Sequence, residues 1–124
     1  MTDKYINGLL NEFFNCLEDR LVMKRLTDLY KINGFGACTC AACMTSYGLM
    51  PNDEDYFGKN SVKITFIPPL CKEDFSFIVT NKVFLAALGN HIEKYLKRHP
   101  EDTMAAKDLI RKIREKMQCQ EQKR

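Results

Sequence analysis

The segment from residue 3 to residue 32 constrains the fold most, because its apolar side chains recur with the 3.6-residue period of an α-helix. The periodic apolar positions are Ile6, Leu9, Leu10, Phe13, Phe14, Leu17, Leu21, Val22, Leu26, Leu29 and Tyr30. Thr2 or Asp3 can cap the first turn, and Asn33-Gly34 can close the last turn in a left-handed conformation. We therefore predict a long helix over residues 3–32. A helix of this length is unusual, and a bend in it would fall within residues 15–20.

Residues 61–80 predict an antiparallel β-hairpin, because apolar and polar side chains alternate in two short runs. The apolar positions of the two runs are Val62, Ile64 and Phe66, then Phe75, Phe77 and Val79. Pro68-Pro69 ends the first run, and Lys72-Glu73-Asp74 supplies the turn before the second. A two-stranded hairpin is marginal in water, so helices must pack against it.

Residues 81–118 predict two further helices, separated at Pro100. Their apolar stripes are Val83, Phe84, Ala87, Leu88, Ile92, Tyr95 and Leu96 in the first, and Met104, Leu109, Ile110, Ile113 and Met117 in the second. The fold class is therefore α+β. We expect a mainly helical single domain over residues 1–124, with a small antiparallel hairpin and a cysteine-rich loop over residues 34–60.

The composition is that of a soluble globular protein, with 45% hydrophobic and 28% charged residues among 124. No run reaches the roughly 18 apolar residues that span a bilayer, and polar residues interrupt any signal-peptide pattern near the N-terminus. We expect no membrane partner and a location in the cytoplasm or nucleus, without secretion. In those compartments cysteines persist as thiols or metal ligands, and disulfides are rare.

Three of the six cysteines lie close together at Cys38, Cys40 and Cys43, and they form a candidate zinc site. Thiolates a few residues apart can approach one ion at little cost in chain entropy, and Cys40-x-x-Cys43 has the spacing of a zinc knuckle. A fourth ligand must come from elsewhere in the chain. We expect Cys71, with His91 as the alternative and His99 or Cys16 as less favoured choices.

An equally weighted interpretation makes these cysteines reduced thiols that are partly buried under the helices, since a free cysteine packs as a small hydrophobe. Dithiol exchange is disfavoured because no βαβ pattern frames the Cys-x-x-Cys. A cysteine nucleophile would need one of only two histidines as its base. The chain also lacks a phosphate-binding glycine loop. We therefore do not expect an enzyme.

The two C-terminal helices are rich in basic residues. Residues 61–124 carry 13 basic and 8 acidic side chains, whereas residues 1–60 carry 6 and 8. The basic set on the helices consists of Lys94, Lys97, Arg98, Lys107, Arg111, Lys112 and Arg114. These side chains could contact the phosphates of a nucleic acid, although solvated and partly paired helix faces are the simpler explanation.

The apolar residues of the first helix suggest a binding role. Leu9, Leu10, Phe13 and Phe14, followed by Leu21 and Val22, cover more than one stripe, and a hairpin with two helices need not cover them all. Uncovered apolar surface usually marks an interface. The expected function is a non-enzymatic interaction or assembly subunit of a larger intracellular complex, for which a viral structural protein would be a suitable context. It would bind protein partners or itself through apolar helix faces. The alternative is a zinc-containing nucleic-acid-binding module.

Overall fold

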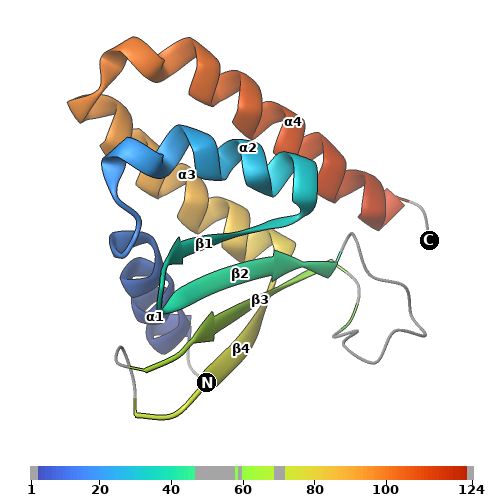
Figure 1. The fold of residues 1–124 in the computed structure, drawn as a ribbon. Coiled ribbons are helices and arrows are strands. Elements are labelled where there is room, and N and C mark those ends of the chain that lie inside the picture. Colours follow the sequence, from blue (N-terminus) through green and yellow to red (C-terminus); the bar gives the residue numbers. More distant parts are fainter. Residues whose placement is uncertain (1–2, 47–57, 59, 69–71, 123–124) are drawn as a thin grey trace.

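Four α-helices and a four-stranded antiparallel sheet make up the part of the chain that the computed structural model describes, residues 3–46, 58, 60–68 and 72–122 (Figure 1). The α+β class, dominated by helices, is confirmed. The elements are α1 (Asp3–Asn15), η1 (Asp19–Leu21), α2 (Val22–Ile32), β1 (Gly34–Cys38), β2 (Ala41–Thr45), β3 (Ser61–Phe66), β4 (Phe75–Thr80), α3 (Asn81–Arg98), η3 (Pro100–Asp102) and α4 (Thr103–Gln122).

The sheet has the order β1-β2-β3-β4, so every strand pairs with its neighbour in sequence. The expected hairpin is β3 and β4, in which Val62 pairs with Val79 and Ile64 with Phe77. The expected cysteine-rich loop is wrong over residues 34–45, because β1 and β2 form a second hairpin there. The rest of that loop lies outside the described residues, apart from Ser46, Gly58 and Asn60.

The first helix is shorter than predicted. It ends at Asn15, and the chain turns through η1 before α2 begins at Val22. This break falls where a bend was expected, and it divides the segment into two helices that lie in different directions (Figure 1). As a result α1 packs against α3, whereas α2 packs against β1 and α4.

The apolar stripes of this segment are covered, which contradicts the expectation of an uncovered remainder. Leu10, Phe13 and Val22 are fully buried, Phe14 is 2% exposed, and Leu9 and Leu21 are half-buried against the same core. The ring of Phe13 contacts those of Phe35 in β1 and Phe66 in β3, with centroids 5.6 Å and 6.5 Å away. The break between α1 and α2 therefore places both stripes in one core.

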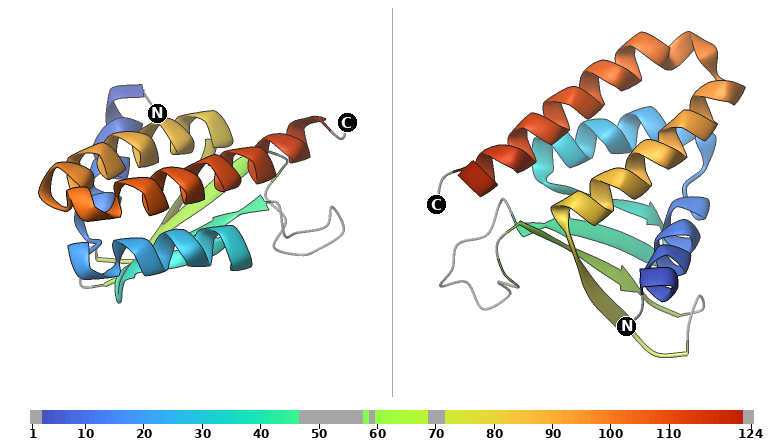
Figure 2. Two further views of the ribbon diagram at one scale, coloured as in Figure 1. Left: turned by 90° about the horizontal axis from the view of Figure 1, so that it is seen from above. Right: turned by 180° about the vertical axis from the view of Figure 1, so that it is seen from behind.

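The helices lie on one side of the sheet, and α4 forms an outer layer. Viewed from above, α2, α3 and α4 run beside one another over the strands (Figure 2). Helix α4 packs on α2 and α3, with Ala106, Ile113 and Met117 buried beneath it. Among the described residues, no helix combines the length and apolar character required to cross a membrane.

Candidate functional site

A groove of about 430 Å³ lies between α3 and α4. Each helix lines it with residues at spacings of three, four and seven, which fall on one face of a helix. The lining consists of Gly89, Ile92, Glu93 and Leu96 from α3 and Lys107, Ile110, Arg111, Arg114 and Glu115 from α4. Pockets of this volume receive ligands or a few side chains of a partner.

The floor of the groove is apolar. Ile92 is 4% exposed, and Leu96 and Ile110 are half-buried against the core. At one end, the absence of a side chain at Gly89 gives room to Arg114, whose Nη2 lies 3.3 Å from the position that a Cβ of residue 89 would take. The guanidinium of Arg114 therefore lies across α3 and closes this end of the groove.

The charges along the groove differ in whether they are already paired. Arg111 donates to Asp108 at 2.8 Å and to Glu115 at 3.1 Å. The hydrogen bond from Arg111 lowers the pKa of Asp108, and the Asp108 carboxylate raises the pKa of Arg111. In contrast, Lys107, Arg114 and Glu93 have no ion pair within the described part of the chain.

The predicted basic residues do not act as one uniform patch. Arg111 and Lys112 form ion pairs with acidic residues of α4, and Arg98 binds Asp19. Lys94 and Lys97 lie exposed on α3 outside the groove. Only Lys107, Arg111 and Arg114 of the set line the groove. The apolar residues and Glu93 of its lining were not expected as site residues. Helical spacing placed the apolar ones among them on a core-facing stripe, but no signal in the sequence shows that the two helices border a common groove.

A polar cluster joins η1 to the corner between α3 and α4. Arg98 donates from Nε and Nη2 to the two carboxylate oxygens of Asp19, both at 2.9 Å, and His99 Nε2 lies 2.9 Å from Asp19 Oδ2. The hydrogen bonds from Arg98 lower the pKa of Asp19 to about 2.

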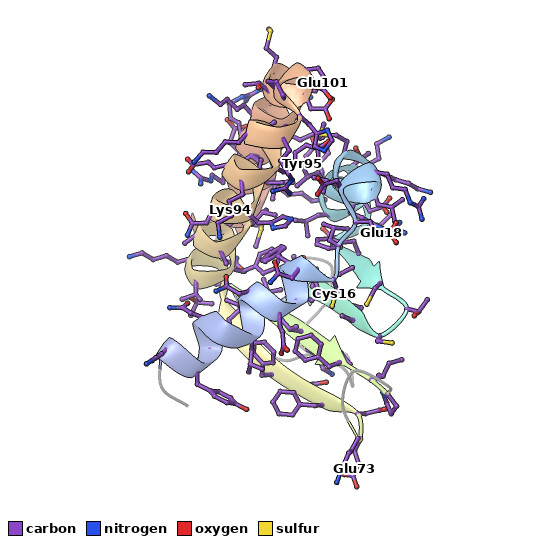
Figure 3. The ribbon with its side chains drawn as sticks, turned by 90° about the vertical axis from the view of Figure 1, so that its left-hand side faces the viewer. Cys16, Glu18, Glu73, Lys94, Tyr95 and Glu101 are labelled. Carbon is purple, nitrogen blue, oxygen red and sulfur yellow. The ribbon has the colours of Figure 1, made fainter. Side chains whose placement is uncertain are left out.

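A second hydrogen bond at this corner joins Tyr95 to Asp102. Tyr95 donates its hydroxyl hydrogen to Asp102, and burial, together with that hydrogen bond, raises the pKa of Tyr95 to about 12. Glu101 marks this corner in Figure 3.

Of the three clustered cysteines predicted as metal ligands, the structure keeps Cys38 and Cys40 close together, with Cys40 N 3.4 Å from Cys38 Sγ, and turns Cys43 away from them. Cys43 in β2 is 6% exposed and faces the core, and its burial raises the pKa of the thiol to about 12. Cys38 at the end of β1 is exposed, and Cys40 in the turn is half-buried. Cys38 and Cys43 thus point to opposite faces of the sheet, whereas a loop could have turned both toward one ion.

Cys16 at the end of α1 comes closest to this group. Figure 3 shows it beside the β1–β2 hairpin. Burial, followed by its hydrogen bond with Cys38, raises the pKa of Cys16 to about 11. In the sequence analysis, Cys16 was considered only as a less favoured zinc ligand.

The alternative ligand His91 stacks on Phe14, with ring centroids 5.3 Å apart. Cys71 lies outside the described residues. No group of three or more histidine, cysteine or acidic side chains is placed for a metal within residues 3–46, 58, 60–68 and 72–122. Because Cys71 is not among them, the four-ligand site stays a prediction.

The arrangement of the groove suits binding. Its apolar floor and charged rim can hold the side chains of another molecule, while its lining contains no histidine, cysteine, serine, threonine or tyrosine to act as a nucleophile or a proton carrier at neutral pH. A second depression of about 400 Å³ lies beside β4, where Ile6 and Asn7 of α1 approach Ile78 and Val83. That depression has no charged residue in its lining.

Comparison with known proteins places the chain in a family. The model of a family described as CDI immunity protein, where CDI is contact-dependent inhibition, matches residues 6–110. The match begins in α1 and ends within α4. No curated protein and no solved structure matches the chain. An immunity protein of this kind is neither a viral assembly subunit nor a zinc-containing nucleic-acid-binding module, so both functions expected from the sequence are wrong.

Proposed function

The chain belongs to the CDI immunity protein family, and from this membership we propose that it binds a toxin protein and keeps that toxin inactive while bound. The observation that carries the proposal is the family match, which extends over residues 6–110 and so includes the whole sheet, α2, α3 and most of α1. The mode of action is that of a binder, in which no bond of the toxin is made or broken.

The surface of the molecule supports a binding role. The groove between α3 and α4 offers an apolar floor with charged walls, the combination that holds protein side chains in many interfaces. A protein partner was also expected from the sequence, although on the basis of apolar stripes that are now seen to be buried. Self-association and nucleic-acid binding have no support from the family. The expected location in the cytoplasm or nucleus stays a prediction.

The proposal is tested with the toxin of the same contact-dependent inhibition system. Bacteria that produce the toxin domain alone should stop growing, and bacteria that also produce this chain should grow. The purified chain and toxin domain should form a complex that elutes as one species in size-exclusion chromatography. A toxin domain from a different system provides the control and should not bind. Growth arrest despite the presence of soluble, folded chain would show that the chain is not the immunity protein of that toxin.

A further inference from the structure

We propose that the toxin docks in the groove between α3 and α4, by inserting an apolar side chain flanked by two carboxylates about 10 Å apart. This inference rests on the proposed function and adds the surface and the chemistry of recognition. The groove is the one concavity described above whose charges specify the charge of what enters it. The groove therefore indicates both the position of the partner on this chain and the charge of the partner's side chains that enter it.

The apolar floor of the groove favours an apolar side chain of the partner. Ile92, Leu96 and Ile110 come from two helices and converge at the bottom of the groove. A partner side chain seated there would remove their remaining exposed apolar area from water, which favours a complex. Apolar side chains in such pockets dominate the energetics of many protein interfaces.

The charged rim of the groove favours carboxylates on the partner. Lys107 and Arg114 have no ion pair among the described residues, whereas Arg111 between them is held by Asp108 and Glu115. The two available cations are seven residues apart on α4, which corresponds to about 10 Å along the helix axis. Carboxylates at this spacing occur on residues seven apart in a helix, which lie on one face of it. Glu93 is the one carboxylate of the groove lining without an ion pair among the described residues, so the unpaired charges of the rim sum to a positive charge.

The position of Arg114 is partly set before the partner arrives. Its guanidinium lies over Gly89, and a Cβ at residue 89 would approach Nη2 to 3.3 Å. A side chain that is already placed loses less conformational entropy on binding than one that is free. Arg114 can therefore contribute more affinity than an ordinary exposed arginine.

The experiment compares two double charge reversals by isothermal titration with the purified toxin domain. Lys107→Glu with Arg114→Glu changes the rim of the groove, and Lys94→Glu with Lys97→Glu changes the net charge equally outside it. We expect the rim variant to bind at least about 100-fold more weakly, because two close charge pairs become repulsive. The control should change the affinity less than about threefold. Ile110→Ser tests the floor and should weaken binding by about tenfold.

The outcomes separate the two proposals. If the unaltered chain does not bind the toxin, the proposed function fails. If it binds and the rim variant binds equally well, or Ile110→Ser has no effect, the toxin docks elsewhere and only the present inference fails. Equal weakening by both charge reversals would indicate long-range attraction without docking in the groove, and would overturn it. Circular dichroism of each variant ensures that a loss of binding is not a loss of folding. A dimer of the unaltered chain that the rim variant breaks would assign the groove to a second copy and would also overturn the inference.

Discussion

His91 is a half-buried histidine whose Nε2 atom is buried without a hydrogen-bond partner among the described residues. Burial of the ring lowers its pKa below the ordinary value of 6.5. The folded chain therefore holds His91 neutral at a pH where the unfolded chain takes up a proton, so the free energy of unfolding falls as the pH drops below about 6.5. We expect His91→Phe, which keeps a ring against Phe14, to lose this part of the pH dependence. Urea unfolding at pH 7.5 and pH 5 measures it.

The second histidine of the chain provides the control. His99→Gln leaves the stacked ring of His91 in place, so the loss of stability on acidification that His91 causes should persist in this variant. If His91→Phe and the unaltered chain lose the same free energy of unfolding between pH 7.5 and pH 5, the burial of His91 has no energetic consequence.

For single residues, the sequence indicated which residue types could bind a metal or titrate, but it did not indicate the surroundings of those residues in the fold. Cys38, Cys40 and Cys43 were interpreted as ligands because of their spacing, which says nothing about whether the backbone between them is a loop or two strands. In the strands, Cys43 occupies a core position and Cys38 faces outward. His91 was considered as an alternative metal ligand, but the sequence does not show that its ring stacks on Phe14, which lies far from it in the chain.

At the scale of elements, the close approach of β1 to β2 depends on Gly34. A Cβ at this residue would lie 2.5 Å from the carbonyl oxygen of Cys43 and 3.2 Å from Cα of Met44, and both are backbone atoms that cannot turn aside. We expect Gly34→Ala to destabilise the protein by about 2 kcal/mol, as overpacking of a tight site does. Urea unfolding followed by circular dichroism measures the change.

Gly8 in α1 is the matched control, since a Cβ there would meet nothing within 4 Å. Alanine favours a helix interior over glycine, so Gly8→Ala should stabilise the protein by about 0.5–1 kcal/mol. Opposite signs for the two glycine-to-alanine changes are the expected result. A neutral Gly34→Ala would mean that β1 can move away from β2 without loss of stability.

The β1–β2 hairpin was missed for a physical reason that its residues make clear. Phe35, Ala37, Ala41 and Cys43 all face the core and alternate with less buried residues, but alanine, glycine and cysteine carry little hydrophobic signal. In contrast, β3 and β4 alternate large apolar residues with polar ones and were predicted correctly. The small residues of β1 lie where α2 packs against that strand. The packing partner that explains them could not be inferred from local sequence.

For the whole molecule, Asp19 links two segments that are 79 residues apart through Arg98. Its lowered pKa of about 2, compared with 3.8 for a free carboxyl, means that the ion pair stabilises the fold above about pH 4 and is lost as the pH falls through about 2. We expect Asp19→Asn to cost about 1 kcal/mol at pH 7, since the pair is partly exposed to solvent. The difference from the unaltered chain should shrink between pH 4 and pH 2. Thermal unfolding across this pH range checks both points.

Asp108→Asn is the comparison for a local ion pair, because Asp108 pairs only with residues three and four positions along α4. Its effect on the free energy of unfolding should be smaller than that of Asp19→Asn. Equal effects would mean that the link between η1 and the α3–α4 corner adds nothing beyond an ordinary surface pair.

At this largest scale, the fold class followed from hydrophobic periodicity, but the groove and the function did not. Helix periodicity gives one apolar stripe for each helix and does not say which half-buried residues of two helices will border a common hollow. Ile92, Leu96 and Ile110 were therefore assigned to the core alone, whereas they also form the floor of the groove. The basic residues were grouped by type, although Arg98 and Arg111 are held by carboxylates.

The order of the strands has a consequence for how the chain folds. Because β1, β2, β3 and β4 pair only with neighbours in sequence, the sheet can form by successive closures of short segments, each with a modest entropy cost. The contacts of α1 with α3 and of α2 with α4 enclose the entire sheet within one loop. Docking of the N-terminal helices onto the C-terminal pair should therefore limit the refolding rate. Destabilising changes at the α2–α4 contact, such as Lys116→Met, which removes the hydrogen bond from Lys116 to the backbone carbonyl of Tyr30, would then slow refolding more than equal changes within the β3–β4 hairpin.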